Sequence, residues 1–503
     1  MKLIVSGAWL LLFFMLSCKK DSAAKSTVIT TVNTDTMAAC PVSLTQQTPA
    51  GKTIHGVNWA CPGDNFSSTV LVLSGLSATD DYAAVTAKAN AILSGIVTNT
   101  GANTIRIPIN YVTASSNWWN AYSGVIDAAT AKGLNVIIGF WEASSSGDGK
   151  VDDDTQFWAM WKIVLQKYGC NPKVYFEIFN EPHGYSLADW SAVCAKWLSN
   201  YPTIPRAHVL IDGTGYATDI TGVGADSRFA GCLLSVHNYT FFNSGSITTV
   251  SAWESKLAAA VGAYSSRAVL TEFGDTMNTG IDYTGAILGS EDIAYIQGMT
   301  NEVRNLNMGS VYWPGVRTGD GYAMEALNGS GTNLTLTNVN TYGLSRLQYS
   351  WGVGTGGTDQ FYTGAYYRLI NVNSGDVLDV NGASTSIGGN LIQWTQNGGN
   401  NQQWIIADGT AGYYTVVNRN SNLYLDVNNA STADGAGIVQ SASSTNNSEQ
   451  WQLVAISTGI YKVVNKNSGL ALTVNGASKT AGAGIIQSAY TGNTNQQWMI
   501  VQE

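Results

Sequence analysis

Short apolar runs alternate with longer amphipathic segments along residues 53 to 351. Apolar runs bounded by turn residues are typical of buried strands, and apolar positions recurring every third or fourth residue are typical of helices. The pattern predicts eight strands, at Thr53–Ala60, Ala102–Asn110, Asn135–Glu142, Val174–Glu181, His208–Tyr216, Leu233–Thr240, Arg267–Asp275 and Gly309–Gly315. It predicts helices at Asp81–Asn99, Asn117–Lys132, Thr155–Tyr168, Leu187–Asn200, Thr249–Ser265, Glu291–Leu306 and Val339–Trp351.

The order of these elements predicts an α/β fold, a (β/α)8 TIM barrel over residues 51–351. The segment between the fifth and sixth strands is short and rich in glycine, so we expect one helix there to be reduced to a turn. The alternative is an open doubly wound sheet, which would carry a G-x-G-x-x-G phosphate loop after its first strand. Val57–Gly63 contains no such motif, and this favours the barrel.

A threefold repeat follows a glycine-rich linker at residues 352–360. Trp404, Trp451 and Trp498 are separated by 47 residues each, and a Leu-Asp-Val or Leu-Thr-Val segment precedes each tryptophan at a constant interval. The repeats are rich in β-branched residues and Asn-Gly turns and lack helical periodicity. They predict an all-β domain, a β-trefoil, over residues 361–503.

The N-terminal residues have the pattern of a targeting segment. Lys2 precedes an apolar run that is too short to span a bilayer comfortably, and the run ends in Ser17 and Cys18. This pattern resembles a lipoprotein signal over residues 1–17, cleaved so that Cys18 receives the lipid. An ordinary secretory signal is the alternative, and both predict export. Residues 18–50, rich in Ser, Thr and Ala, are expected to form a flexible tether to the bacterial cell envelope.

Composition narrows the class of ligand. Charged residues make up 12% of the chain, the net charge is −9, and no basic stretch is present, so nucleic acid is not an expected partner. The chain contains 16 tryptophans, and flat aromatic faces suit amphipathic ligands such as sugar rings. Five cysteines remain besides Cys18, at spacings unlike those of a zinc site, and the sequence leaves their connectivity open.

Polar residues cluster where the predicted barrel strands end. Val174–Pro182 is apolar except for Glu177 until Asn180 and Glu181, and Pro182 has no N–H with which to continue the ladder. The other strand ends carry Arg106, Trp141, Glu142, His237, Tyr239, Glu272 and Trp313. Each residue alone has a structural interpretation, such as a buried ion pair, a core histidine or a barrel-filling tryptophan. A barrel would bring all of them to one mouth, and this joint pattern favours an active site.

Five motifs resemble those of the retaining glycoside hydrolases of family 5: Ile105–Pro108, Phe179–Pro182, His237–Tyr239, Thr271–Gly274 and Tyr312–Trp313. The resemblance covers the whole predicted barrel. It implies a cellulase-like or β-glucanase-like enzyme, in which Glu181 would be the general acid/base and Glu272 the nucleophile.

The same resemblance implies roles for the neighbouring residues. Asn180 would hold the 2-hydroxyl of the sugar, and Arg106 would orient the nucleophile. His237 and Tyr239 would complete the hydrogen-bond network around the two carboxylates. Trp313 would form the floor of the subsite for the sugar that is cleaved.

Retaining chemistry needs one protonated carboxylic acid and one ionised carboxylate, with a separation of about 5–5.5 Å. We expect Arg106 to lower the pKa of Glu272 and keep it anionic. Esterification of Glu272 would then remove its charge and allow Glu181 to act as a base. No metal and no cofactor are expected.

Some residues depart from the usual pattern of the family. Many members carry a histidine where this chain has Trp141 and Glu142, and the loop after the eighth strand carries Arg317 and Asp320. We expect these four residues to contact or shape the sugar subsites. Aspartates 152–154 are interpreted as a solvated turn, since their spacing is not that of a calcium loop. Substrates other than β-glucan therefore remain open, including mannan and arabino- or galactofuranosides. A non-catalytic surface glycan-binding protein is the alternative, and the presence of both glutamates argues against it.

The trefoil motifs resemble those of ricin-B-type lectins, with Gln-Gln-Trp at residues 402–404 and 496–498 and Glu-Gln-Trp at 449–451. The three tryptophans are expected in the core. A sugar site of this family requires an aspartate, an aromatic residue and an Asn-Gln pair. The first repeat has the full set, Asp379, Trp394, Asn401 and Gln402. We expect one sugar site in this repeat, and the alternative is that the trefoil serves only as a spacer. The protein is expected to be a monomer.

Overall fold

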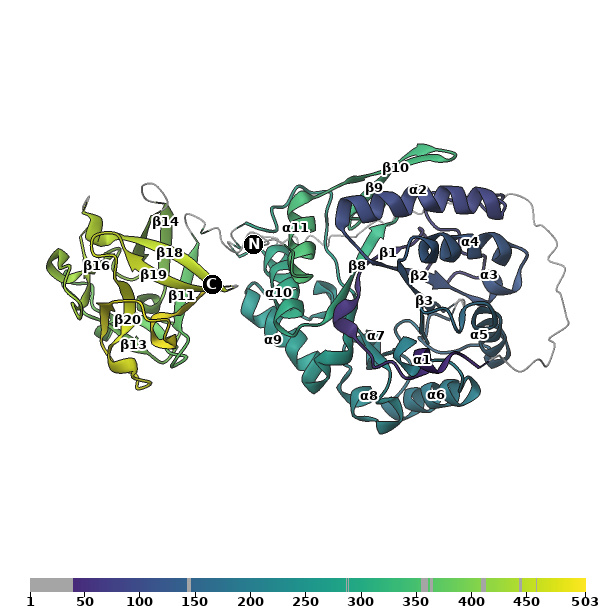
Figure 1. Cartoon of the computed structure of the whole chain (residues 1–503), viewed down its shortest axis with the longest axis horizontal. Coiled ribbons are helices and arrows are strands. Elements are labelled where there is room, and N and C mark those ends of the chain that lie inside the picture. The colour runs from purple at the N-terminus through teal and green to yellow at the C-terminus, as the bar shows by residue number, and fades with distance from the viewer. Residues whose placement is uncertain are drawn as a thin grey trace, which may run out of the picture. The chain divides into compact units, whose positions relative to one another are not determined.

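The computed structural model describes residues 39–142, 146–285, 287, 289–353, 361, 365–408, 413–442, 446–457 and 459–503. The first domain is a closed barrel of eight parallel strands in sequential order (Figure 1). The strands are β1 (His55–Trp59), β2 (Thr104–Ile109), β3 (Asn135–Phe140), β4 (Val174–Glu177), β5 (Val209–Asp212), β6 (Leu233–His237), β7 (Ala268–Glu272) and β8 (Gly309–Val316). The predicted TIM barrel is confirmed.

Helices surround the barrel; those that were predicted lie within a few residues of the predicted bounds, and the short α3 was not predicted. They are α2 (Tyr82–Thr100), α3 (Tyr111–Ser115), α4 (Trp118–Ala131), α5 (Asp154–Tyr168), α6 (Leu187–Asn200), α9 (Val250–Val261), α10 (Glu291–Asn305) and α11 (Thr341–Ser350). The sequence explains the ends of α2: the Asp81 side chain accepts the Ala84 N–H, and Gly101 closes the helix at φ 76°. Only short helices, α7 (Thr214–Ala217) and α8 (Thr221–Ala225), separate β5 from β6, as the glycine content predicts.

Three local features differ from the predictions. Strand β4 ends at Glu177, before the predicted end at Glu181, because the chain turns out of the barrel before the acidic motif. A hairpin of β9 (Glu325–Ser330) and β10 (Asn333–Asn338) was not predicted, since its residues are mostly polar and exposed.

The third difference lies at the N-terminus, where the tether was expected to extend to residue 50. Residues 18–38 of that prediction lie outside the described residues. From Ala39 onward the chain has defined structure: helix α1 (Val42–Thr45) forms, and Cys40 is disulfide-bonded to Cys170 after α5. The barrel domain therefore begins about ten residues earlier than predicted, because a covalent bond holds this segment to it.

The interior of the barrel changes from apolar to polar along the strands. Near the amino ends the inward side chains form an apolar layer of Ile54, Ile137, Leu210, Leu233, Val269 and Val311. Successive inward positions are two residues apart in a strand. Two residues after Leu210, Leu233 and Val269 come the buried polar residues Asp212, Ser235 and Thr271. The apolar layer thus supports a polar layer at the carboxyl ends.

The second domain is an antiparallel trefoil. Its strands are β11 (Tyr366–Asn371), β12 (Val377–Val380), β13 (Leu391–Trp394), β14 (Trp404–Asp408), β15 (Tyr414–Asn418), β16 (Tyr424–Val427), β17 (Ile438–Ser441), β18 (Gln450–Ser457), β19 (Ile460–Asn465), β20 (Ala471–Val474), β21 (Ile485–Ser488) and β22 (Trp498–Gln502). Trp404, Trp451 and Trp498 are fully buried, as predicted. Their indole N–H groups donate to the carbonyls of Leu378, Leu425 and Leu472, so each repeat uses the same contact.

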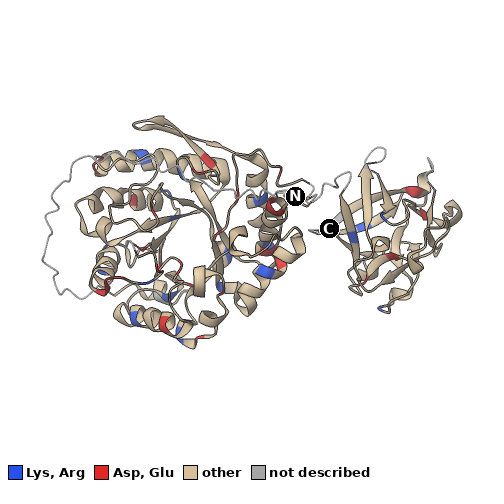
Figure 2. Cartoon of the chain, turned by 180° about the vertical axis from the view of Figure 1, so that it is seen from behind, with Lys and Arg blue, Asp and Glu red and all other residues tan. Residues whose placement is uncertain are grey.

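The distribution of charged residues agrees with the absence of a basic stretch in the sequence. Figure 2 shows basic residues scattered among acidic and uncharged ones, without a continuous basic stretch in that view. Within the described ranges, no helix combines the length and apolar character needed to cross a membrane.

Candidate active site

A buried arginine is the centre of the polar layer. Arg106 on β2 is 1% exposed, and its guanidinium donates to side chains of four residues. Nε contacts Glu177 at 2.5 Å, Nη1 contacts Glu272 at 2.6 Å and Asn58 at 2.9 Å, and Nη2 contacts Asn180 at 2.6 Å. The planar fork of an arginine suits such a set of fixed acceptors. Arg106 therefore fixes the geometry of the mouth.

Glu272, the last residue of β7, lies at the carboxyl end of the barrel with only 6% of its side chain exposed. Its Oε1 accepts from Arg106, and its Oε2 accepts from the Tyr239 hydroxyl at 3.0 Å. Burial raises the pKa of Glu272, and at neutral pH the charge of the nearby Arg106 guanidinium opposes this rise. The expected lowering by Arg106 is thus present but is outweighed by burial. The two hydrogen bonds donated by Arg106 and Tyr239 still favour the ionised form of Glu272.

Glu181 has a different environment. It follows β4 with a left-handed backbone, φ 58°, and its side chain is 23% exposed. Its Oε1 lies 2.9 Å from Nδ1 of His237. Burial raises the pKa of Glu181 to about 7 and lowers the pKa of His237 to about 4. At neutral pH the imidazole is therefore uncharged, and a large share of Glu181 keeps its proton.

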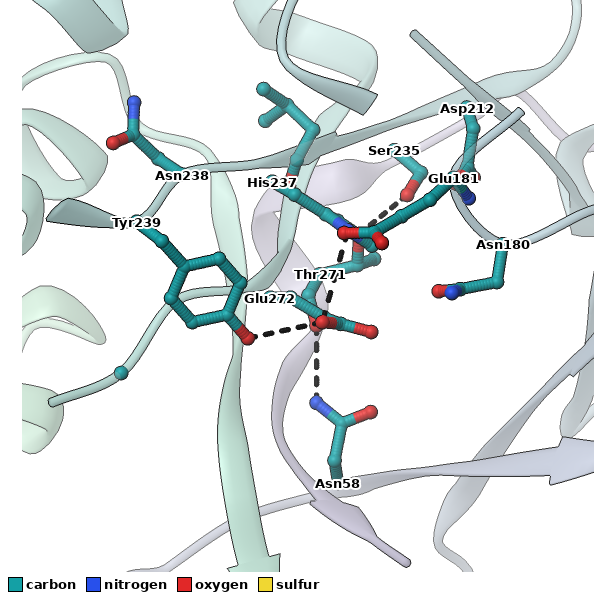
Figure 3. A network of polar contacts seen from close by, with 12 residues as sticks. Asn58, Asn180, Glu181, Asp212, Ser235, His237, Asn238, Tyr239, Thr271 and Glu272 are labelled. Carbon is teal, nitrogen blue, oxygen red and sulfur yellow. Dashed lines mark hydrogen bonds and ion pairs between the residues drawn. The ribbon is translucent and has the colours of Figure 1, made fainter. Parts of the chain in front are cut away.

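The two carboxyl groups point toward one another (Figure 3). An oxygen of Glu181 and an oxygen of Glu272 lie within 4.8 Å of each other, and a ring nitrogen of His237 lies within the same distance of both. Retaining glycosidases hold their carboxyl groups about 5–5.5 Å apart, whereas inverting enzymes leave about 6.5–9.5 Å for a water molecule. The separation fits retention.

Two tryptophans line the mouth beside these carboxyls. The Trp141 and Trp313 rings have centroids 5.2 Å apart, and the guanidinium of Arg106 lies 5.8 Å from the Trp141 ring centre. Trp313 is half-buried and Trp141 is 3% exposed. The exposed part of Trp313 offers an aromatic face for a sugar ring, while Trp141 packs behind it.

Glu142 holds its own loop, contrary to the expectation that it contacts sugar. Its Oε1 accepts from the Ser146 hydroxyl and the Asp148 N–H, and its Oε2 accepts from the Gly149 N–H. Asp148 and Asp152 offer oxygens within 4.8 Å of this carboxylate, but both are exposed. Because the Glu142 oxygens are already bonded to donors of the loop, this cluster resembles a loop anchor more than a metal site.

Arg317 and Asp320 also bind the protein. Arg317 donates to Asp320 at 2.6 Å, to Asp64 at 2.9 Å and to the carbonyl of Cys61 at 3.1 Å. Its guanidinium lies 5.8 Å from the Trp313 ring centre. Arg317 thus links the loops after β1 and β8 and supports Trp313, rather than presenting a free charge to substrate.

Sequence analysis missed the polar residues below the mouth. Asn58, Glu177, Asp212, Ser235 and Thr271 are all buried and belong to the network in Figure 3 or contact it. Gly139 provides the room, since a Cβ there would lie 2.5 Å from an oxygen of Glu177. These residues could have been recognised in β5, β6 and β7, where a polar residue follows an inward-facing apolar residue by two positions. The predictions considered only the polar residues at the ends of strands.

An aromatic row on the loops after β4, β5 and β6 was also missed. The ring of Phe241 stacks on Tyr239 at 4.7 Å, Phe242 stacks on Tyr216 at 5.5 Å, and Tyr216 stacks on His183 at 4.2 Å. Phe241 and Tyr216 are 63% and 45% exposed. We call these five residues the aromatic row; it begins at the Tyr239 hydroxyl beside Glu272 and ends two residues after Glu181.

In the trefoil, the expected residues of the first repeat lie together. Asp379 Oδ2 accepts from the amides of Asn401 and Gln402, each at 2.9 Å. Asp379 pairs with Ile392 across the β12–β13 hairpin, so Trp394 projects from the same face, and its side chain is 43% exposed. In the second repeat Glu449 instead accepts from Ser441, and in the third Gln496 contacts Thr473. Among the repeats, the first combines a buried carboxylate with an exposed aromatic ring.

Comparison with known proteins agrees with both domains. Residues 67–315 match the family model described as "Cellulase (glycosyl hydrolase family 5)". Residues 351–441 and 447–503 match "Ricin-type beta-trefoil lectin domain-like".

Individual relatives cover parts of the chain. The manganese dependent endoglucanase Eg5A of Phanerodontia chrysosporium is 30% identical over 129 residues, 21% of this chain and 33% of that protein. The chain thus spans about a third of the length of this curated relative. Among solved structures, the designed threefold-symmetric protein ThreeFoil is 49% identical and covers 27% of this chain and 97% of its own, with a TM-score of 0.27. An exo-beta-1,3-galactanase from Clostridium thermocellum, 1,3Gal43A, is 30% identical over 35% of this chain and 37% of its own, with a TM-score of 0.28.

Proposed function

The chain belongs to the retaining O-glycosyl hydrolases of family 5 and carries a ricin-type trefoil lectin domain, and from this premise we propose that it hydrolyses a β-linked glucan. The observation that carries the proposal is the pair of close but unlike carboxyl groups, Glu272 bound by Arg106 and Tyr239, and Glu181 bound by a neutral histidine. Retaining hydrolysis needs this difference between two carboxyls.

In the proposed first step, Glu272 attacks the anomeric carbon and forms an ester with the sugar. Glu181 gives its proton to the departing glycosidic oxygen, so the leaving sugar departs as a neutral alcohol. In the second step Glu181, now ionised, takes a proton from water as the water oxygen attacks the anomeric carbon, and the bond from that carbon to Glu272 breaks, which gives net retention. Glu272 leaves as a carboxylate, and Arg106 and Tyr239 stabilise its charge.

Asn180 is placed to hold the 2-hydroxyl of the bound sugar, because its own Oδ1 is fixed by Arg106 and its amide group is then free to donate. Trp313 would carry the ring of that sugar. The β-glucan assignment follows the family; mannan and furanosides are the competing substrates. Manganese dependence belongs to the name of the relative, and the mechanism proposed here uses residues of this chain alone.

We further propose that the protein is exported and lipid-anchored through Cys18, with the enzyme as a monomer. The buried disulfide between Cys40 and Cys170 supports an oxidising compartment.

The test of the function is a screen of the purified protein on β-glucans, mannans, aryl pyranosides and aryl furanosides, with and without EDTA and added Mn²⁺. Release of reducing ends from a β-glucan, with retained configuration in the first product, is expected. Cleavage confined to mannans or furanosides would replace the substrate assignment, and no hydrolysis of any glycan would favour the glycan-binding alternative.

The aromatic row is expected to bind the leaving part of the substrate, because it borders Glu181. Phe241→Ala and Tyr216→Ala should raise KM for long oligosaccharides by about 5- to 100-fold, which corresponds to about 1–3 kcal/mol for one lost stacking face. KM for aryl glycosides, which lack these leaving sugars, should hardly change. Phe66→Ala, on an exposed aromatic outside the row, is the matched control. An equal rise in KM for long oligosaccharides and for aryl glycosides would contradict the placement of the leaving sugars on the aromatic row.

The trefoil is expected to hold insoluble glycan through its first repeat. Trp394→Ala and Asp379→Ala should weaken binding to insoluble polysaccharide by at least about tenfold while leaving hydrolysis of soluble aryl glycosides unchanged. Depletion of the protein from solution by the polysaccharide measures this. Tyr490→Ala, at an aromatic residue after β21 in the third repeat, is the control; unchanged binding of both first-repeat variants would support a spacer role instead.

A further inference from the structure

A second carboxyl pair lies beneath the acid/base, and the proposed mechanism does not use it. Asp212, the last residue of β5, and Glu177, the last residue of β4, are both fully buried. An oxygen of Asp212 lies within 4.8 Å of an oxygen of Glu177, and no donor among the described residues reaches Asp212 Oδ1. Two ionised carboxylates have only acceptor oxygens, so a hydrogen bond between them requires one proton.

The partners of each group decide where that proton resides. Glu177 accepts from Arg106 Nε at 2.5 Å through one oxygen and from the Ser235 hydroxyl at 2.9 Å through the other. Within the described part of the chain, Asp212 forms no salt bridge with a lysine or arginine, and the charge of Arg106 acts on it only from a longer distance. Arg106 therefore holds Glu177 as the carboxylate, and Asp212 keeps the proton. Burial and the Glu177 charge raise the pKa of Asp212 far above its ordinary value, in agreement with this assignment.

Asp212 also contacts the backbone of the proposed acid/base. Its Oδ2 accepts the Glu181 N–H at 3.0 Å, beside the left-handed residue itself (Figure 3). A non-glycine residue with positive φ persists only where its surroundings hold it. Among the described residues, the other titratable and charged groups around the pair include His237 on β6, with a ring nitrogen within 4.8 Å of both carboxyls, Arg106 and Glu272 beyond it, and the buried thiol of Cys194 on α6.

We propose that Asp212 is a positioning residue in the form of a neutral carboxylic acid: it donates to Glu177, accepts the N–H of Glu181, and so holds Glu181 over His237. This inference rests on the proposed function, because it assigns a role relative to the acid/base. A neutral Asp212 also keeps a second negative charge away from Glu181. Such a charge would raise the pKa of Glu181 further and leave it a weaker acid.

The test compares substitutions that distinguish the acid from the carboxylate. Asp212→Asn copies a neutral acid, since its amide N–H donates to Glu177 and its oxygen accepts from Glu181. This conservative variant should keep kcat/KM within about threefold of wild type, with the same pH profile. Asp212→Leu removes both hydrogen bonds and should lower kcat by about 10- to 100-fold with little change in KM. Glu177→Gln removes one of the two carboxylates that Arg106 binds and should lower activity, although it is also an exchange of a carboxyl for an amide.

A loss in Asp212→Asn as large as in Asp212→Leu would overturn the neutral acid, and full activity in Asp212→Leu would overturn the positioning role. A second measurement does not depend on hydrolysis. An acid whose pKa is raised on folding stabilises the fold fully below its unfolded pKa, about 3.9, and this stability is lost as pH rises. The melting temperature of Asp212→Asn minus that of wild type should therefore grow from pH 4 to pH 8.

A constant or shrinking difference would overturn the proposal. Glu325→Gln is the matched control: Glu325 is a buried carboxyl on β9 bonded to Asn99, away from the mouth. Its melting temperature should also rise relative to wild type with pH, while its activity profile should remain that of wild type. If the wild type hydrolyses no glycan, the proposed function fails, and the melting series still decides the state of Asp212.

Discussion

Glu272→Ala should reduce kcat by on the order of 10⁴- to 10⁶-fold on every glycoside that the wild type cleaves, a loss comparable to that of other covalent nucleophiles. The physical reason is that Glu272 is the carboxylate held by both Arg106 and Tyr239 at the mouth, so its removal takes away the proposed nucleophile. The smaller side chain leaves space beside the guanidinium. Azide should enter that space, attack the sugar directly and give a glycosyl azide of inverted configuration. Product configuration by NMR is the measurement.

The control for this variant is Glu254→Gln, which alters a carboxyl on α9 bonded to Asn301, outside the mouth. It should retain wild-type activity. A Glu272→Ala protein that still forms a retained product without azide would show that another residue is the nucleophile.

Glu181→Gln is the second large effect, with a loss in kcat of about 10²- to 10⁴-fold on natural glycans, the usual contribution of general acid/base catalysis. The loss should be much smaller in the first step for aryl glycosides, because their phenols leave without protonation. The ester on Glu272 should then accumulate, and azide should resolve it to a glycosyl azide of retained configuration. Burst kinetics and product NMR separate this result from that of Glu272→Ala.

The same residue fixes the expected pH dependence. The pKa of Glu181 is raised to about 7 by burial, so its proton is present below pH 7 and is lost above it. For the wild type, kcat/KM should therefore fall as pH rises through about 7. In Glu181→Gln this alkaline limb should disappear, because the amide does not titrate. If kcat/KM of Glu181→Gln still falls as pH rises through about 7, a group other than Glu181 causes that fall.

The contrast between the two glutamates comes from their neighbours. Glu272 ends β7 and accepts from Arg106 on β2, whereas Glu181 lies beyond the end of β4, with a neutral imidazole as partner. These partners belong to strands far apart in sequence. Separate sequence motifs therefore identify the carboxyls, and their spatial neighbours decide which of them is the acid.

The position of a charged residue near the end of a strand does not by itself decide whether its side chain contacts the ligand. Arg317 and Glu142 are polar residues on loops of the correct edge, and sequence position alone makes them candidates for sugar contact. In the structure their hydrogen-bonding atoms are used by Asp64, Asp320 and the loop of residues 146–149. Whether a loop charge faces the ligand or the protein depends on donors and acceptors supplied by other loops, which no local pattern encodes.

By itself, the sequence determined the barrel, the trefoil, the three core tryptophans and the positions of both glutamates, because these depend on periodicity, on repeats and on polar residues at or just beyond the ends of strands. Tertiary structure alone decided three other features: the buried acid Asp212 beneath Glu181, the disulfide that holds residues 39–50 to the barrel, and the aromatic row. Each of these depends on contacts between segments distant in the chain. The raised pKa of Asp212 depends on its burial, while the disulfide and the aromatic row depend on which segments lie side by side. Both conditions are met only after the strands have closed into the barrel.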